Sequence, residues 1–394
     1  MSTRAREELR VIACLFFVLF VGVADNQVLS PLLPAIRAQF GKSSSALAYL
    51  FTGYSFAAGL SVLIWGPLSD IFGRKSGLLA GLIIFIIGSC ISYTSAVFVL
   101  LLAGRILTGM GASMLSLNTI SYTADFFPYE KRGWAMGAVF SSYFAALILG
   151  VPLGSWLGEK NGWNFVFGAM GSAALCLLVL TSLLLPPSTQ KRMASGFPGT
   201  EYLRQYLSFL RDRITVGALL SSFFASAGTT GFLAFLIMWM HDSFNISGGK
   251  VRLVFIVCGG AALLASPVAG VIADRIGKRL QFLLSNLSLA FFLFILPSLH
   301  WEPALFLVFG LISLSAAFRQ GPMEAVLTEI VPASSRGTFV ALKNSCSQLG
   351  IGLAALFSGI LFERAGYSRV CFLGAISNLL AAGSMLLTLR NKRL

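Results

Sequence analysis

Charged residues are scarce in this sequence. Asp, Glu, Lys and Arg together make up 11% of its 394 residues, whereas hydrophobic residues make up 56%, and a soluble domain is about 25% charged. A chain with so little charge cannot hide its apolar side chains in a core that water surrounds. The composition therefore predicts a membrane protein.

Residues that commonly bind metals are also few. The chain has two histidines, His241 and His300, and both fall at the ends of expected helices. Six cysteines lie singly inside apolar runs with no paired spacing: Cys14, Cys90, Cys176, Cys258, Cys346 and Cys371. Such cysteines act as small hydrophobic residues rather than as metal ligands or disulfide partners. We therefore expect no metal site and no cofactor.

Signals for nucleotide chemistry and catalysis are missing too. The sequence has no Gly-rich loop ending in Gly-Lys-Ser or Gly-Lys-Thr, so ATP-driven pumping is not expected. It also has no polar segment large enough for a catalytic domain and no histidine or cysteine cluster. The net charge of +14 would suit nucleic acid, but the basic residues are spread over short turns. We expect neither an enzyme nor a nucleic-acid partner.

Long apolar stretches are what the chain does contain, and twelve of them can cross a bilayer at about 20 residues each. We expect these spans at about 11–34, 46–68, 76–95, 97–123, 133–158, 163–185, 213–240, 251–272, 280–299, 303–328, 337–362 and 368–389. The sequence thus predicts an all-α integral membrane protein of twelve transmembrane helices.

The one long polar segment, 186–212, divides the spans into two sets of six. We therefore expect an N-terminal six-helix bundle (1–185), a cytoplasmic linker (186–212) and a C-terminal six-helix bundle (213–394). Within the linker, three leucines recur at helical spacing: Leu203, Leu207 and Leu210. This spacing predicts a short helix that lies on the membrane surface.

Three polar motifs recur after 204 residues. Residues 66–75 return as 270–279, residues 125–133 as 329–337, and residues 159–163 as 363–367. Three matches at one offset indicate a duplicated unit. Because each copy has six helices, an even number, both copies share one orientation, as in transporters built from parallel repeats.

The distribution of Lys and Arg predicts which side the termini face. The termini and the loops on their side hold 19 of these residues, and the opposite loops hold seven. Basic residues concentrate on the cytoplasmic side of membrane proteins, so we expect both termini in the cytoplasm. Three basic residues fall inside spans: Arg105, Arg319 and Lys343.

Several motifs resemble those of one family. The turn Gly66…Asp70…Gly73-Arg74-Lys75 and the stretch Leu102-Ala103-Gly104-Arg105-Ile106-Leu107-Thr108-Gly109-Met110-Gly111 are similar to signature motifs of the major facilitator superfamily. The stretch 149–158, with Gly150, Pro152, Gly154 and Gly158, is similar to a motif of its twelve-helix drug:proton antiporters and its arabinose-efflux-permease-like branch. The resemblance covers the whole chain and implies the major facilitator fold.

The chain departs from the family pattern at two positions. Ile71 stands where the family usually has a basic residue, although the second copy keeps one as Arg275. Val151 separates Gly150 from Pro152, whereas the antiporter motif has glycine and proline adjacent.

The resemblance implies a latch at the turn between the second and third spans. Asp70 would accept hydrogen bonds from a helix N-terminus in the other half, where the helix dipole favours an anion, and Asp125 could pair with Arg74. The alternative is that Arg74 and Lys75 only fix topology by their charge. The gating candidates are Gly66, Asp70, Gly73, Arg74, Lys75, Asp125, Arg132, Gly150, Pro152, Gly154, Gly270, Asp274, Arg275, Gly277 and Arg336.

Asp25 is the sharpest candidate for proton coupling. It lies about 13 Å from the outer end of its span and Arg105 about 12 Å, at a rise of 1.5 Å per residue. Ionisable groups at such depth are costly unless they pair or face a cavity. We expect Asp25 to bind and release a proton beside Arg105. Arg105 binding an anionic substrate, or a purely structural ion pair, are the alternatives.

The second half has no charged counterparts of this pair at the 204-residue offset. Its own candidates are Glu324, a further proton-coupling residue, and Lys343, which could meet Glu324 near the inner gate. A structural pair is the alternative. The remaining substrate-cavity candidates are Asn26, Gln27, Asn118, Tyr122, Tyr143, Arg319, Gln320, Asn344 and Gln348. Five of them could instead satisfy a neighbouring helix: Asn118, Tyr122, Tyr143, Asn344 and Gln348.

These observations favour a proton-coupled secondary transporter that exports a small molecule by alternating access. The alternatives are a symporter or facilitator that imports a small, anionic nutrient, and a non-transporting membrane receptor. We expect the partners to be a small-molecule substrate, protons and the lipid bilayer. A monomer in a bacterial plasma membrane is the expectation that the resemblance adds.

Overall fold

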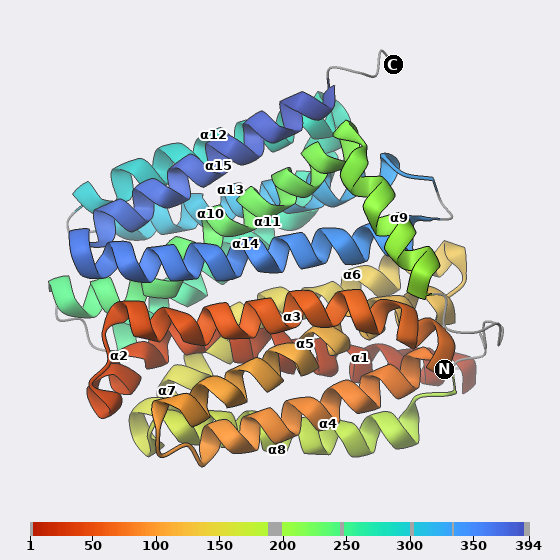
Figure 1. Ribbon diagram of the computed structural model, residues 1–394, viewed down its shortest axis with the longest axis horizontal. Coiled ribbons are helices and arrows are strands. Elements are labelled where there is room, and N and C mark those ends of the chain that lie inside the picture. The colour runs from red at the N-terminus through yellow and green to blue at the C-terminus, as the bar shows by residue number, and fades with distance from the viewer. Residues whose placement is uncertain (1–2, 188–198, 245–247, 300–302, 333–334, 390–394) are drawn as a thin grey trace. The chain divides into compact units, whose positions relative to one another are not determined.

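The computed structural model of the chain describes residues 3–187, 199–244, 248–299, 303–332 and 335–389 (Figure 1). Every regular element in this part of the chain is a helix, which pairs backbone N–H and C=O groups inside lipid. In these described ranges, eleven helices are long and apolar enough to cross a membrane, and there are twelve when the bent pair α1 (Thr3–Gln27) and α2 (Leu29–Phe40) is counted as one span. The predicted all-α membrane fold of twelve spans is confirmed.

The described chain divides into two compact units, and the division does not follow the linker alone. The first unit comprises Met1–Leu32 and Gly53–Gly199, and the second comprises Leu33–Thr52 and Thr200–Leu394. The boundary therefore also passes through α2 and through α3 (Ser44–Phe72). The division into two six-helix bundles stays a prediction.

The first unit is built on a core between α1, α4, α5 and α8. Besides α1 and parts of α2 and α3, it contains α4 (Arg74–Tyr93), α5 (Phe98–Phe126), α6 (Tyr129–Ala145), the π turn η1 (Ala146–Gly150), α7 (Val151–Asn161) and α8 (Trp163–Leu184). Its fully buried side chains include Leu15, Val18, Leu82 and Phe85.

The second unit packs α10 (Arg213–Phe244) against α14 (Arg336–Ala365) and α15 (Tyr367–Leu389). It also contains α9 (Gly199–Arg211), α11 (Gly248–Ile276), α12 (Lys278–Ile295), the 3₁₀ turn η2 (Leu296–Ser298) and α13 (Pro303–Glu329). The long helices of this unit run side by side, and α9 runs across the direction of α10 and α14 (Figure 1).

Matching turns in the two units confirm the repeat. Gly73 precedes α4 with φ of 90°, and Gly277 precedes α12 with φ of 91°. This left-handed region strains any residue with a Cβ atom. Both glycine N–H groups donate to the carbonyl four residues back, on Ser69 and Ala273. The 204-residue offset therefore relates backbone conformation as well as sequence.

Candidate functional site

The most deeply buried charged pair lies in the first unit, beside a break in its first span. Asp25 is near the end of α1, and the chain bends by 44° before it continues as α2. Arg105 approaches from α5, and both side chains are 0% exposed. The nitrogen Nη1 of Arg105 donates to Oδ2 of Asp25 at 2.6 Å. The predicted pairing of Asp25 with Arg105 is confirmed.

Two aromatic rings cover the guanidinium of Arg105. Its Cζ lies 4.6 Å from the ring centre of Tyr54 on α3 and 5.4 Å from that of Phe167 on α8. Gly109 lies one turn beyond Arg105, and a Cβ there would collide with the backbone carbonyl of Tyr54. The glycine thus lets α3 approach α5 closely enough for the Tyr54 ring to reach the cation.

The pair leaves part of its hydrogen-bonding capacity unused. Among the described residues, Oδ1 of Asp25 and both Nε and Nη2 of Arg105 are buried without a partner. Buried polar groups without partners are costly, and their occurrence needs a reason. One oxygen of the Asp25 carboxylate is thus left as an open acceptor, and the aromatic rings cover the cation.

The turn between α3 and α4 is tied to the rest of the first unit. Nε of Arg74 donates to Oδ2 of Asp125 at 3.3 Å, and its Nη1 donates to the hydroxyl of Ser69 at 2.6 Å. Lys75 donates to the carbonyls of Ser182 and Leu185 at the end of α8. The predicted pairing of Arg74 with Asp125 is confirmed. Lys75 satisfies a helix C-terminus, where a cation is favourable.

The other gating candidates make fewer described contacts. The side chain of Asp70 lies outside the described part of the structure, so its latch stays a prediction. Gly66 is half-buried at the end of α3, and Nε of Arg132 is buried without a described partner. The candidates in or near the second copy of the turn are all exposed: Gly270, Asp274, Arg275 and Gly277. Arg336, at the start of α14, is exposed too.

The fifth span packs tightly against the break in the first. A Cβ on Gly150 would lie 2.9 Å from Cβ of Ala24, and one on Gly154 would collide with Cγ2 of Val28. These glycines, together with Pro152, follow or end the π turn η1. Small residues let membrane helices approach closely, so this surface fixes the backbone on both sides of Asp25.

Two charged groups of the second unit also pair as expected. Nζ of Lys343 on α14 donates to Oε1 of Glu324 on α13 at 2.5 Å. The Lys343 side chain is 6% exposed and that of Glu324 is 40% exposed. The predicted pair is confirmed, and its carboxylate is accessible from outside the unit.

Arg319 is different, because it is buried among neutral groups. It is 4% exposed, and its Nη1 donates to the amide oxygen of Asn378 at 2.8 Å. Weaker contacts join it to Asn286 at 3.5 Å and to the hydroxyl of Thr229 at 3.4 Å. Within the described residues no carboxylate pairs with Arg319, and its Nε has no partner. The neutral amides were not predicted, since asparagines in apolar helices give no signal of their orientation.

The uncharged cavity candidates fall into two groups. Asn118 is fully buried and packs on Gly77, and the Tyr122 hydroxyl donates to the carbonyl of Pro186 at 2.8 Å. These two contact neighbouring segments, although Oδ1 of Asn118 is buried without a described partner, as are the amide oxygens of Gln27 and Gln348. Asn26 and Asn344 are half-buried, and Tyr143 and Gln320 are exposed. Their cavity role stays a prediction.

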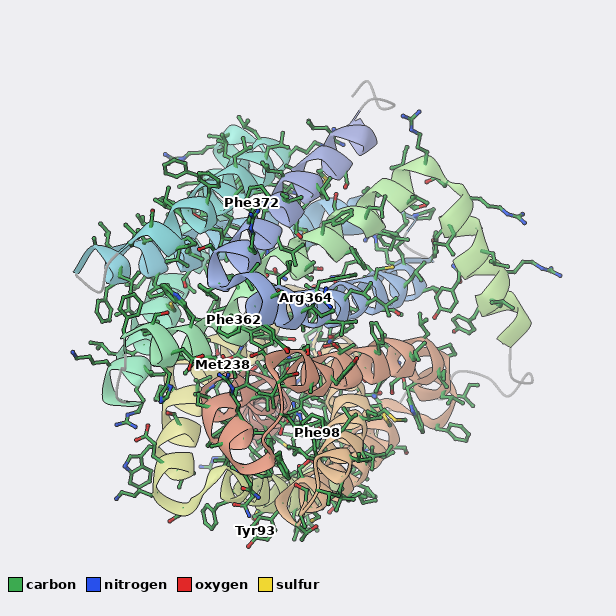
Figure 2. All side chains as sticks on the ribbon, turned by 60° about the vertical axis from the view of Figure 1, so that its left-hand side comes forward. Tyr93, Phe98, Met238, Phe362, Arg364 and Phe372 are labelled. Carbon is green, nitrogen blue, oxygen red and sulfur yellow. The ribbon has the colours of Figure 1, made fainter. Side chains whose placement is uncertain are left out.

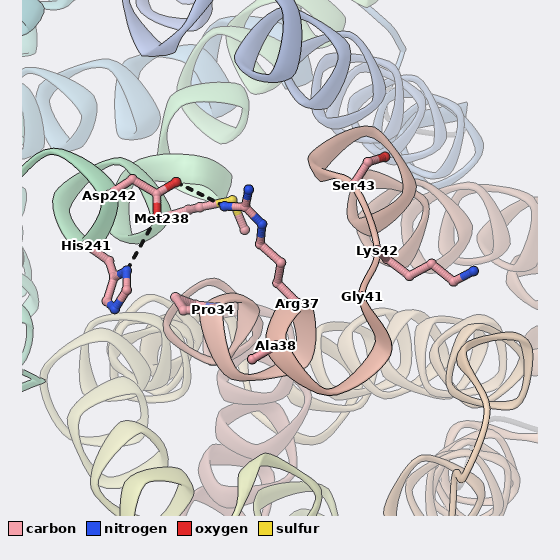
Figure 3. A pocket seen from close by; sticks show the side chains of 9 residues that line it. All are labelled: Pro34, Arg37, Ala38, Gly41, Lys42, Ser43, Met238, His241 and Asp242. Atoms are coloured by element: carbon pink, nitrogen blue, oxygen red, sulfur yellow. Dashed lines mark hydrogen bonds and ion pairs between the residues drawn. The ribbon is translucent and has the colours of Figure 1, made fainter.

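A site that sequence reasoning missed lies at one end of the second unit. The segment 33–52 forms an open pocket of about 550 Å³ with the end of α10. Dashed lines in Figure 3 join Asp242 to Arg37 at 3.0 Å and to His241 at 3.4 Å. Oε2 of Glu363 accepts from the backbone N–H and the hydroxyl of Ser45 at 3.0 and 2.6 Å. Glu363 therefore supplies an anion to the N-terminus of α3, where the helix dipole favours one.

Comparison with known sequences identifies the chain. The family model for the Major Facilitator Superfamily matches residues 15–227 and 218–393, which together span most of the sequence. The chain belongs to the Major Facilitator Superfamily.

Relatives in this superfamily resemble the chain over nearly its full length. It is 27% identical over 358 residues to the uncharacterized MFS-type transporter YwfA of Bacillus subtilis, covering 89% of this chain and 85% of that protein. It is 24% identical over 374 residues to the uncharacterized MFS-type transporter YbcL of the same bacterium, covering 95% and 94%. The chain is thus a multi-pass membrane transporter with bacterial relatives, and not an enzyme.

Two solved structures share the major facilitator fold. The human organic anion transporter MFSD10 (TETRAN) superposes with a TM-score of 0.73 at 19% identity, covering 96% of this chain and 99% of that one. The D-xylose-proton symporter superposes with a TM-score of 0.75 at 19% identity, covering 97% of each chain. The predicted superfamily is confirmed, and the antiporter subtype stays a prediction.

Proposed function

We propose that this chain is a proton-coupled transporter that exports a small molecule by alternating access, in a bacterial cell membrane with both termini in the cytoplasm. The Asp25–Arg105 pair carries the proposal, because it is fully buried and Asp25 keeps one oxygen without a partner among the described residues. Such ionisable groups inside a membrane are expensive and are typical of proton relays.

The coupling follows from the charge of the pair. With Asp25 ionised, the pair is neutral and suits a dry interior. A proton on Asp25 leaves a lone guanidinium, whose burial costs several kcal/mol unless water reaches it. Protonation therefore favours a conformation that opens the site to water, and proton release favours the buried arrangement. A ligand shifts a conformational equilibrium only by such differential affinity.

Export is supported by the fifth span. Its Gly150…Pro152…Gly154 sequence resembles the antiporter motif, and its glycines pack on Ala24 and Val28, next to Asp25 in the chain. A change in that packing would move the backbone that presents Asp25. The proton site and the surface that resembles the antiporter motif are thus mechanically linked.

The test is substrate-driven proton movement in proteoliposomes that contain a pH-sensitive dye. A panel of lipophilic cations, neutral compounds and organic anions is added to wild-type protein and to Asp25→Asn. Asparagine keeps the shape of aspartate and a hydrogen bond to Arg105 but cannot titrate. We expect compound-driven proton flux in the wild type and the signal of empty liposomes in Asp25→Asn.

Glu7→Gln is the matched control, since it removes an exposed carboxylate from the same helix. Infrared difference spectra between acidic and alkaline buffer add a readout that needs no substrate. The carboxylic acid band should be present in wild type and in Glu7→Gln and weakened in Asp25→Asn. Proton flux that survives in Asp25→Asn would refute the assignment.

A second candidate is import or export of an organic anion. It is favoured by Arg319, a buried cation whose described partners are all neutral. A substrate carboxylate would supply the missing negative charge, because guanidinium and carboxylate match in shape and charge. The human structural neighbour bears the name of an organic anion transporter, which is compatible with such a substrate.

A further inference from the structure

Helix α9 (Gly199–Arg211) is too short to cross a membrane, unlike the helix that follows it. It has 13 residues and ends one residue before α10, which begins at Arg213 and is apolar enough to cross a membrane. A helix joined so closely to the end of a span is held at the level where the bilayer surface begins. This position brings α9 within reach of lipid headgroups.

The corner between α9 and α10 is fixed by three hydrogen bonds. Oδ2 of Asp212 accepts from the backbone N–H of Thr215 at 3.0 Å, which satisfies a free donor at the start of α10. The Thr215 hydroxyl makes contacts with the carbonyls of Asp212 and Phe209. These hydrogen bonds, all within residues 209–215, thus set the direction of α9 relative to α10.

One face of α9 is buried against the second unit. Phe209 is 8% exposed, and its ring lies edge-on to that of Phe339 on α14, with 5.4 Å between the ring centres. This contact determines which residues turn outward. Figure 2 shows side chains that project from the pale green α9 away from the rest of its unit.

The outward face carries an apolar strip beside a basic one. Leu203, Leu207 and Leu210 are 58, 46 and 52% exposed, and spacings of four and three residues align them along the helix. Arg204 and Arg211, seven residues apart, are exposed next to this strip. Among the described side chains neither arginine forms an ion pair.

We propose that this face of α9 binds anionic phospholipids of the bilayer surface. The three leucines enter the acyl region, as in other interfacial helices, and the two guanidinium groups bind lipid phosphates, which they match in geometry. Charge complementarity selects this occupant: a strip of leucines alone would accept any lipid, whereas the adjacent arginines favour an anionic headgroup. The proposal does not depend on proton coupling or on the direction of transport.

The full-length protein in nanodiscs provides the test. A photoactivatable benzoylphenylalanine at Leu207 reports which lipid lies against the leucine strip, and the adduct is identified by mass spectrometry. We expect adducts with phosphatidylglycerol in strong preference to phosphatidylcholine in mixed nanodiscs. Benzoylphenylalanine at Ser208, on the polar side of the same exposed face, should give few lipid adducts.

The arginines are tested with Arg204→Gln/Arg211→Gln in the same labelled background. Each basic residue near an anionic surface strengthens binding about fivefold, so removing both arginines should weaken the phosphatidylglycerol preference about 30-fold. The matched control is Arg364→Gln/Arg369→Gln, which removes two exposed charges from another region of the same unit. It should leave the preference at Leu207 unchanged.

Three results would overturn the proposal. Equal adducts with both lipids, unaffected by Arg204→Gln/Arg211→Gln, would mean apolar insertion without headgroup recognition. Suppression of the adducts by soluble glycerol phosphate would mean a site for a free phosphate compound. Adducts with a protein, including a second copy of this chain, would mean that α9 is a protein-docking helix.

Discussion

The three basic residues that the sequence places inside spans have different partners among the described residues. Arg105 has a fully buried carboxylate, Lys343 has a half-exposed one, and Arg319 has amide oxygens and a hydroxyl. Removing one member of a buried ion pair typically costs about 3–5 kcal/mol. Arg319 has no such partner among the described residues, so its loss should affect a ligand more than the fold.

We expect Arg319→Gln to weaken binding of carboxylate compounds at least about 30-fold, because loss of a buried charge contact costs about 2 kcal/mol or more. The thermal unfolding midpoint of the ligand-free protein should not fall, since a buried uncompensated charge is removed. Arg319→Lys should retain part of the binding. Scintillation proximity with benzoate-like acids and a thermal melt measure both quantities.

The amide analogues of the same acids serve as controls for Arg319. Their binding should be equal in wild type and Arg319→Gln. Equal weakening for acids and amides, or a sharp fall in the unfolding midpoint, would assign Arg319 a purely structural role.

Depth along a span could be predicted from the sequence, and rotation about its axis could not. Counting residues placed Asp25 and Arg105 at similar depth, and the cost of isolated charges made their pairing the expected outcome. Nothing in the apolar second and sixth spans showed that Tyr54 and Phe167 would enclose the guanidinium, because helices that are apolar on most faces give no orientation.

At the scale of helices, close approach depends on individual glycines. The surface between α7 and the α1–α2 break is one such place, since a Cβ on Gly154 would collide with Val28. In α6, by contrast, Gly137 has open space around its Cβ position. Gly154 and Gly137 therefore allow the same substitution to be compared at a tightly packed position and at an open one.

Gly154→Ala should destabilise the protein by about 1–3 kcal/mol through overpacking. Gly137→Ala should stabilise it by about 0.5–1 kcal/mol, because alanine favours helix. Thermal unfolding in detergent measures both, and Val28→Ala should restore much of the loss caused by Gly154→Ala. A similar response at the two positions would contradict the contact between α7 and Val28 at the α1–α2 break.

Helix boundaries followed from apolar runs and glycine turns, as at Gly73 and Gly277. The motif at residues 149–158 predicted close packing but not the helix that it packs against. Small residues allow another helix to approach closely, but they do not identify that helix. The contacts of Ser45 and Asp242 had no sequence signal, since an isolated polar residue at a helix end is ordinary in any membrane protein.

At the scale of the whole molecule, the segment 33–52 belongs to one unit while the chain on both sides of it belongs to the other. It groups with the second unit through Arg37–Asp242 and Ser45–Glu363, yet its chain continues into the first unit on both sides. Under the alternating access proposed above, we expect these contacts to break in one of the two states.

Linking Arg37→Cys to Asp242→Cys with a short thiol cross-linker should therefore stop transport, and a cleavable linker should restore it. Compound-driven dye signals in proteoliposomes measure the effect. Each single cysteine variant, treated in the same way, controls for reaction at native cysteines. Transport at the wild-type rate in the cross-linked protein would show that this contact persists through the cycle.

The π turn at Ala146–Gly150 has a consequence for the rotation of the helix beyond it. A π turn holds one residue more than the α turn that it replaces, and it ends at Gly150, which Val151 separates from Pro152. One added residue in an α-helix would rotate everything beyond it by about 100°. Beyond the wider turn, a Cβ on Gly154 would meet Val28 and one on Gly158 would meet Leu32. The π turn thus sets the rotation at which these glycines face the backbone beside Asp25.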